Sequence, residues 1–376
     1  MDVVATTEGR AAAARFFDPL TIGGLAIRNR LAVAPMTRVS ATDTGHATGR
    51  MADYYAAFAD GGFGLIITEG LYPDEIWSQG YLHQPGLADD TQGDSWRPIV
   101  ERVHAAGARF IAQLMHAGAI SQGNRFRTDT RGPSAIRPAG QQMPFYRGSG
   151  EYPVPVEMTP AEIEEAVAGF ASAAIRAREA GFDGVELHGA NGYLLDQFLT
   201  EGVNQRTDAY GGDATGRLRL TVETAHAVRA AVGPDFIVGV RSSQGKVNDF
   251  VHKWRGEDEA AAIYDLLGQL PIDYLHTTEF EAWQPAFRDG SSLAALAKRH
   301  SRLPVLANGS LHDPARATEL LLEHGVDMVT LGRGALTHAD WPRRVAAGAQ
   351  LDDFDRRILA PLADLANADR FHQARD

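Results

Sequence analysis

The stretch Val185-Glu186-Leu187-His188-Gly189-Ala190-Asn191-Gly192-Tyr193-Leu194-Leu195 places three polar side chains directly after a short apolar run. We expect the run to be a β-strand with His188 at its carboxyl end, and a helical turn to open directly afterwards. That turn would bring Asn191 and Tyr193 back beside the histidine. Three neutral hydrogen-bonding groups would then converge on one small ligand.

The same pair of elements recurs along the chain. Short apolar runs that end in Gly, Pro or polar residues alternate with longer segments of helical periodicity, which is the pattern of βα units and a parallel sheet. The predicted strands are 31–34, 64–68, 109–114, 183–187, 236–241, 272–276, 304–307 and 327–331. The predicted helices are 52–59, 95–105, 161–180, 217–231, 258–267, 292–300, 314–324 and 341–346. This repeat favours an α/β fold, a closed (β/α)8 TIM barrel, and leaves an open doubly wound sheet as the alternative.

One segment does not fit the repeat. Residues 118–158, between the third strand and the third helix, contain five prolines and six glycines with weak periodicity. This excursion is too long for an ordinary connection. We expect it to cover the carboxyl-end face of the barrel, and a surface insertion without a functional role is the other interpretation. We treat 1–376 as a single domain in which 1–15 is loosely ordered.

Composition excludes several classes of protein. The formal net charge of −12 argues against a general binder of nucleic acid or anionic membranes. The absence of cysteine excludes disulfides, iron–sulfur clusters, thiolate zinc sites and a catalytic thiol. The chain shows no signal-peptide core and no apolar run near the ~20 residues of a membrane helix. We therefore expect a cytoplasmic protein, and a homo-oligomer is compatible with the sequence.

In a TIM barrel the active site lies at the carboxyl ends of the strands. The predicted strand ends are polar and lack a metal-ligand cluster. They comprise Pro35-Met36-Thr37, Glu69-Gly70, Gln113, His188 with Asn191 and Tyr193, Arg241, His276, Asn308-Gly309-Ser310 and Gly332-Arg333. Gln113 interrupts an apolar strand, where an amide is buried only if it is hydrogen-bonded.

These motifs closely resemble the Old Yellow Enzyme family of FMN-dependent ene-reductases, and Thr37 resembles its threonine branch. The resemblance extends from residue 17 to residue 342, and its most specific parts are HGANGYLLDQFL at 188–199 and NQRTDAYGG at 204–212. It implies a TIM barrel, FMN as cofactor, NADPH or NADH as reductant and a small electrophilic alkene as substrate. It also implies a ping-pong cycle in which hydride from flavin N5 reaches the β-carbon of the alkene.

The resemblance further implies a set of FMN-binding residues. Gln113 would contact the pyrimidine edge, Arg241 the N1–O2 side and Thr37 the O4 atom. Phosphate would bind at the loops after strands seven and eight, where glycines admit backbone amides and an arginine supplies charge. Which amides of the seventh loop meet it stays open, because the chain has Asn308-Gly309-Ser310 where many members have consecutive glycines or a Gly-Asn. The full set is Pro35, Met36, Thr37, Gly70, Gln113, Arg241, Asn308, Gly309, Ser310, Gly332 and Arg333.

The resemblance also implies which residues bind the substrate. His188 and Asn191 match the pair that binds the carbonyl or nitro oxygen, and Tyr193 matches the donor that protonates the α-carbon. The segment Arg241-Ser242-Ser243-Gln244 departs from the family pattern, which puts the loop toward Phe250 in doubt. Aromatic residues after strands are the candidate pocket walls, namely Tyr72, Phe250, Trp283 and Phe287.

Other functions remain as alternatives. A metal-dependent hydrolase would use Glu186, His188 and His276, although strand-end metal clusters are absent. A Schiff-base aldolase needs a lysine at a strand end, and no lysine of the chain stands at one. Larger relatives with an iron–sulfur cluster and a second nucleotide-binding domain are disfavoured by the lack of cysteine. A flavoprotein without turnover is disfavoured by the retained site, and a desaturase, demethylase or isomerase on the same scaffold stays open.

Overall fold

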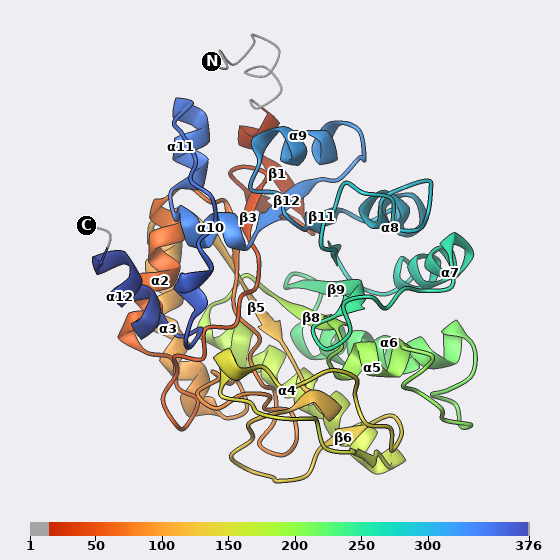
Figure 1. Cartoon of the computed structure of the whole chain (residues 1–376). Helices are drawn as coiled ribbons and strands as arrows, with labels where there is room; N and C mark the ends of the chain where they lie inside the picture. The colour runs from red at the N-terminus through yellow and green to blue at the C-terminus, as the bar shows by residue number, and fades with distance from the viewer. Residues whose placement is uncertain (1–14, 375–376) are drawn as a thin grey trace.

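The computed structural model describes residues 15–374, which are organised around a closed barrel of eight strands (Figure 1). Every pair of neighbouring barrel strands is parallel. The predicted TIM barrel is therefore confirmed, and the open sheet is wrong. The barrel strands are β3 (Leu31–Val33), β4 (Leu65–Ile67), β5 (Arg109–Leu114), β8 (Gly184–Asn191), β9 (Ile237–Lys246), β10 (Tyr274–Thr278), β11 (Val305–Asn308) and β12 (Met328–Leu331).

Helices surround the barrel, and each predicted helix overlaps one of them. The longest, α4, begins with a capping box between Thr159 and Glu162 and ends at Gly181, whose φ of 96° suits glycine. The helices at the predicted positions are α2 (Gly49–Asp60), α3 (Asp90–Ala105), α4 (Pro160–Ala180), α6 (Ala214–Val232), α7 (Glu257–Leu267), α8 (Leu293–Ser301), α9 (Pro314–Leu322) and α11 (Trp341–Ala347). Among residues 15–374, three further helices lie outside the predicted ranges: α5 (Leu194–Leu199), α10 (Arg333–Thr337) and α12 (Leu365–Gln373).

Strands β8 and β9 run further than expected. Strand β8 continues past His188, and its last residue Asn191 pairs with Lys246 after a register shift. The Asn191 amide also donates to the Ser243 hydroxyl over 2.8 Å. The expectation that a helical turn opens directly after the histidine is wrong, because pairing with β9 continues as far as Asn191 and α5 begins only at Leu194.

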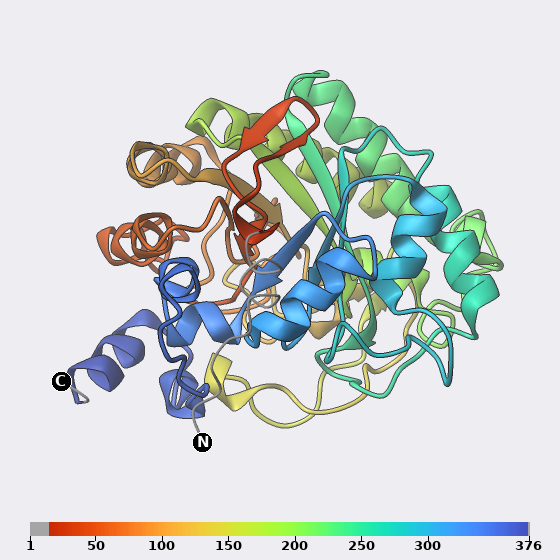
Figure 2. The same ribbon diagram turned by 90° about the horizontal axis from the view of Figure 1, so that it is seen from above.

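A hairpin closes the amino-terminal end of the barrel. Its strands are β1 (Leu20–Ile22) and β2 (Leu25–Ile27). Ile22 and Ile27 are buried in the same apolar cluster as residues from the barrel strands, including Leu65, Ile67 and Leu306. Figure 2 shows the red hairpin at one end of the barrel and the yellow excursion at the other. The interior of the barrel is therefore packed with apolar side chains below its mouth.

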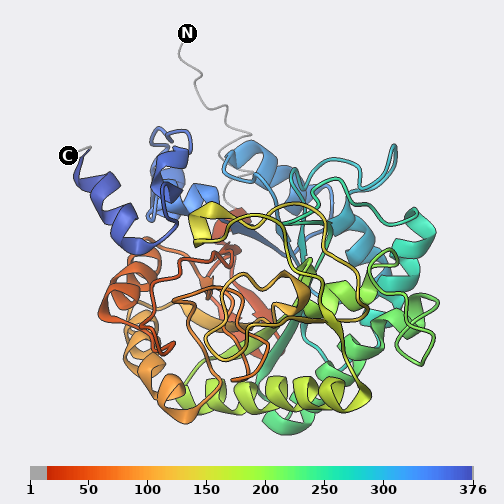
Figure 3. The same ribbon diagram turned by 60° about the horizontal axis from the view of Figure 1, so that its bottom comes forward.

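The excursion 118–158 crosses the barrel mouth in Figure 3. It contains the short elements η2 (Gly118–Ile120), β6 (Arg131–Gly132), η3 (Pro144–Tyr146) and β7 (Val156–Glu157). The remaining elements are η1 (Arg15–Phe17) and η4 (Arg356–Leu359). The expectation that 1–15 is loosely ordered falls outside the described residues, apart from Arg15. Within 15–374, every helix is too short or too polar to cross a bilayer.

Candidate active site

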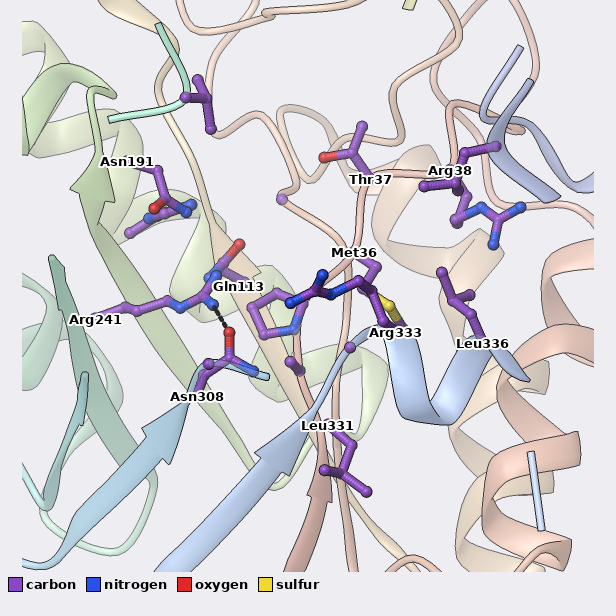
Figure 4. Close-up of a pocket in the computed structure, with 18 of the residues that line it drawn as sticks. Met36, Thr37, Arg38, Gln113, Asn191, Arg241, Asn308, Leu331, Arg333 and Leu336 are labelled. Carbon is purple, nitrogen blue, oxygen red and sulfur yellow. Dashed lines mark hydrogen bonds between the residues drawn. The ribbon is translucent and has the colours of Figure 1, made fainter. Parts of the chain in front are cut away.

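A cavity of about 450 Å³ lies at the carboxyl-terminal ends of the barrel strands, within the size range of small-molecule sites. Figure 4 shows Arg241 and Asn308 on one wall, and Met36, Thr37 and Arg333 on others. All residues expected to bind the cofactor line this cavity: Pro35, Met36, Thr37, Gly70, Gln113, Arg241, Asn308, Gly309, Ser310, Gly332 and Arg333. The expected substrate residues His188, Asn191, Tyr193 and Phe250 line it too.

Three arginines line the cavity, namely Arg38, Arg241 and Arg333. Arg241 is 4% exposed and donates from Nη2 to Asn308 Oδ1 over 3.1 Å, as the dashed line in Figure 4 shows. Its Nε is buried without a hydrogen-bond partner among the described residues. Arg333, at the beginning of α10, donates to the Ser310 hydroxyl and lies over the Phe280 ring. A buried donor without a partner is costly, so an acceptor in the cavity would stabilise this wall.

The loop after β11 brings its backbone close to the cavity. Gly309 has a φ of 146°, and a Cβ there would lie 2.3 Å from the Glu279 carbonyl oxygen, so only glycine fits. Ser310 has a φ of 53° and donates from its hydroxyl to the Phe280 carbonyl over 2.6 Å. Glycine backbone beside the Arg333 guanidinium is a donor set suited to a phosphate.

A buried hydrogen-bond network forms the floor of the cavity. Gln113 donates to Glu186 over 2.8 Å, and the other oxygen of Glu186 lies 2.9 Å from His276 Nδ1 and 3.0 Å from the Tyr274 hydroxyl. Burial opposes ionisation of Glu186, but His276, Arg241 and Gln113 outweigh it and lower the pKa of the carboxyl. The expected hydrogen bond of Gln113 is thus present. Glu186 and His276 are hydrogen-bonded to each other. Residues 15–374 contain no group of three or more His, Cys, Asp or Glu side chains that could hold a metal ion, which disfavours the hydrolase alternative.

The end of β8 and the turn after it carry His188, Asn191 and Tyr193, and His188 stands opposite Arg241 in the register of β8 and β9. The rings of His188 and Tyr193 lie 4.7 Å apart, and His188 Nδ1 is buried without a hydrogen-bond partner among the described residues. Burial, with the nearby Arg241 and His276, lowers the pKa of His188 well below its ordinary value. The histidine is therefore neutral at neutral pH, and one ring nitrogen donates while the other accepts.

Tyr193 is held by a second phenol. Its hydroxyl lies 2.7 Å from that of Tyr81, and both side chains are buried. Burial raises the pKa of Tyr193 to about 12, although the Tyr81 hydrogen bond and the Arg241 charge act in the opposite direction. Tyr193 is therefore protonated throughout the physiological range.

Several lining residues were missed from the sequence. Tyr81 lies in a turn-rich segment after β4 without periodicity, and Met143, Phe145 and Tyr146 lie in the excursion. The length of the excursion was the only signal that it would reach the site. Tyr146 holds the excursion at the cavity, because its hydroxyl donates to the Thr37 carbonyl over 3.2 Å.

Three residues expected to form pocket walls lie elsewhere. Tyr72 is fully buried and accepts a hydrogen bond from Gln92 over 2.7 Å, so it packs behind the cavity instead of lining it. Trp283 packs against the core with Arg316 5.2 Å above its ring, also outside the cavity lining. Phe287 likewise is absent from the lining. Phe250 does line the cavity and is 80% exposed at its mouth.

The chain matches a known protein family over most of its length. The model of the NADH:flavin oxidoreductase / NADH oxidase family matches residues 15–352. The chain belongs to this family. It is accordingly an FMN-dependent oxidoreductase with a nicotinamide as reductant. The cavity fits FMN, because it joins cationic side chains and a glycine-bearing loop to a wall of neutral donors.

Members of the family align over most of the chain. The NADH oxidase of Thermoanaerobacter brockii is 33% identical over 88% of this chain, which spans 50% of that protein. A probable flavin mononucleotide-dependent alkene reductase of Leishmania infantum is 35% identical over 90% of this chain and 92% of that protein. An Old Yellow Enzyme homologue of Zymomonas mobilis is 30% identical, with a TM-score of 0.84 over 92% of this chain and 96% of that one.

Proposed function

We propose that the protein reduces the carbon–carbon double bond of small electrophilic alkenes, such as enones and nitroalkenes, at the expense of NADH or NADPH. The observation that carries this proposal is that two sets of groups line one cavity. One set offers the cations and amides that suit a flavin, and the other offers the neutral donors His188, Asn191 and Tyr193. FMN, once reduced by the nicotinamide, supplies the hydride for the alkene.

The cofactor would be held by residues on three sides of the cavity. Arg333, with the backbone of Gly309, Ser310 and Gly332, would bind the phosphate. Arg241, whose Nε has no partner among the described residues, would face the side of the isoalloxazine that becomes negative on reduction. The remaining ring contacts would come from Pro35, Met36, Thr37, Gly70, Gln113 and Asn308, with Thr37 at O4 as in the threonine branch of the family.

The substrate would be activated through its oxygen. His188 and Asn191 would donate hydrogen bonds to a carbonyl or nitro oxygen, on which negative charge grows as hydride reaches the β-carbon. Because His188 is neutral, it would stabilise this charge by donation without transferring its proton. Tyr193 would then give its hydroxyl proton to the α-carbon. The double bond becomes a single bond with two added hydrogens, and the nicotinamide is oxidised.

The test begins with the purified protein and FMN. We expect a yellow complex that NADH or NADPH bleaches anaerobically and that enones, nitroalkenes or maleimides restore, with the saturated product in equal amount. A protein that binds no FMN, or whose reduced form reacts with none of these alkenes, would refute the proposal. Desaturated, demethylated or isomerised products would instead indicate a specialist on the same scaffold.

Phenol binding tests the substrate residues separately from the residues that would bind FMN. A phenolate that accepts hydrogen bonds from His188 and Asn191 would stack on oxidised flavin and give a long-wavelength charge-transfer band. We expect His188→Ala with Asn191→Ala to abolish this band and to leave FMN bound. Loss of flavin in this double variant would show that the pair is structural.

A further inference from the structure

The turn that carries Asn191 and Tyr193 has an unusual backbone. Asn191 has a φ of 61° and Gly192 a φ of 85°, so two consecutive residues adopt the left-handed region. Such a conformation costs free energy at a non-glycine residue and persists where the surroundings over-determine it. The contacts that hold this turn therefore decide where Asn191 and Tyr193 stand in the cavity.

A buried carboxylate holds the middle of the turn. Asp196 is fully buried on α5, and one of its oxygens accepts the Gly192 amide N–H over 2.7 Å. Its other oxygen accepts the Lys246 ammonium over 2.6 Å, and Lys246 is 5% exposed. The carboxylate thus bridges the turn to a cation on the neighbouring strand.

Lys246 is placed for this contact by the extension of β9. It stands opposite Asn191 in the register of β8 and β9, and the next amide, that of Val247, donates to the Asn191 carbonyl over 3.0 Å. Lys246 follows the segment Arg241-Ser242-Ser243-Gln244, in which the chain departs from the pattern of the family it resembles. Buried ion pairs are seldom a net gain in stability, because desolvation offsets their attraction. The pair lies next to the strained turn, so its contribution is to the conformation of that turn.

We propose that Lys246 is a positioning residue, which keeps Asp196 ionised and thereby fixes the Asn191-Gly192-Tyr193 turn so that both polar side chains face the cavity. This inference rests on the proposed function, because it assumes that Asn191 and Tyr193 act on the substrate. Without the ammonium, a buried carboxylate has no counter-charge and turns away from Gly192 or takes up a proton.

The groups that face Asp196 are few. Lys246 on β9 and His252 beyond it act on the charge of Asp196, and His252 is itself faced by Asp249 and Glu259. Burial lowers the pKa of His252, with Lys246 adding to the effect, so the histidine is neutral at neutral pH. Burial raises the pKa of Asp196 against the pull of Lys246. Removing the lysine therefore moves the pKa of this carboxyl further upward.

The test compares phenol affinity with pH in FMN-loaded variants. We would titrate para-hydroxybenzaldehyde into wild type and Lys246→Met between about pH 6 and pH 9 and read the charge-transfer band. We expect the ratio of dissociation constants, variant over wild type, to be near one at low pH, where Asp196 is protonated and still accepts from Gly192. The ratio should rise to about tenfold at high pH, where an unpaired carboxylate leaves the turn.

Three further variants make the result specific. Lys246→Arg should behave as wild type, because it restores the cation. Lys246→Met with Asp196→Asn should bind with wild-type affinity at every pH, since the amide still accepts from Gly192 and cannot ionise. Lys246→Met with Asp196→Ala should lose about tenfold at every pH. If Lys246→Met alone does not bind FMN, the two double variants still test the inference.

A matched control separates positioning from general stability. Lys298→Met breaks another lysine–aspartate pair, with Asp327 over 2.7 Å, at the amino-terminal end of β12. It should leave phenol affinity unchanged. A ratio for Lys246→Met that is near one at every pH, or an equal loss in the Asn and Ala double variants, would overturn the inference. A wild type that loads FMN but gives no charge-transfer band would overturn the proposed function as well.

Discussion

The hydroxyl oxygens of Tyr81 and Tyr193 lie 2.7 Å apart in a buried cluster that also contains Tyr152. When Tyr193 gives up its proton, a phenolate is left in an apolar setting, where an unpaired charge is costly. A hydroxyl of Tyr81 that donates to this phenolate would reduce the cost. Tyr81 therefore lies where it can assist the proton transfer that we propose for Tyr193.

The first prediction concerns these two phenols. Tyr193→Phe should slow the reaction of reduced enzyme with 2-cyclohexenone by about 10²- to 10⁴-fold, the usual contribution of a general acid. Tyr81→Phe should slow it by about tenfold, because one hydrogen bond to the phenolate is lost. Stopped-flow reoxidation under anaerobic conditions measures both rates. An unchanged rate in Tyr193→Phe would show that solvent supplies the proton.

The second prediction concerns pH. Tyr193 acts in its protonated form, and burial raises its pKa to about 12. The rate of alkene reduction by the reduced enzyme should therefore not fall through loss of this proton between about pH 7 and pH 10. The comparison of wild type with Tyr193→Phe isolates this proton, because other groups titrate in both proteins. A fall near pH 9 that occurs in wild type alone would contradict the assignment.

The third prediction concerns the proposed phosphate contact. Arg333→Met should raise the dissociation constant of FMN about 10- to 100-fold, since a charge-assisted hydrogen bond contributes about 1.5–3 kcal/mol. Quenching of flavin fluorescence by the apoprotein measures it. Arg316→Met is the control, because that arginine lies over Trp283 away from the cavity. Equal affinity in wild type and Arg333→Met would place the phosphate elsewhere.

The fourth prediction concerns Glu69, which is buried and accepts the backbone N–H groups of Arg38 and Val39 just after Thr37. Burial raises the pKa of its carboxyl from 4.5 to about 7. The unfolded chain loses this proton near pH 4.5 while the folded chain keeps it up to about pH 7. Stability therefore falls as pH rises through this window, by about 3 kcal/mol from this group.

Glu69→Gln should lack that part of the pH dependence, because an amide does not titrate. Urea unfolding of the FMN complex at pH 4.5, 6 and 7.5 measures the difference in free energy of unfolding between wild type and variant. Glu101→Gln, at an exposed position of α3, is the control and should follow wild type. Parallel curves for wild type and Glu69→Gln would contradict the prediction.

The order of elements was predictable from sequence because each barrel strand is a buried apolar run. The run 109–114 was found with its true limits. The extension of β8 and β9 was not predictable, because residues 242–246 carry no apolar alternation and are held by hydrogen bonds to the neighbouring strand. The hairpin β1–β2 was missed because no helical segment separates its two strands, so they do not fit the βα repeat.

The candidate site was predictable where residues follow strands directly. Gln113 and Asn308 lie at the ends of β5 and β11, Arg241 lies within β9, and the barrel brings all three to one cavity. Tyr81 was not predictable, since its contact with Tyr193 joins loops 112 residues apart in the chain. Tyr72 was expected to line the pocket, but an aromatic residue after a strand can face either into the cavity or away from it. Here the hydrogen bond from Gln92 holds the Tyr72 side chain away from the cavity.

The hairpin β1–β2 has a consequence for the order of events in turnover. Ile22 and Ile27 fill the amino-terminal end of the barrel, so ligands reach the cavity from its carboxyl-terminal mouth. The nicotinamide and the alkene would then compete for this mouth and for the same space above the flavin. At high concentration each should inhibit the binding of the other, and the oxidised nicotinamide must depart before the alkene arrives.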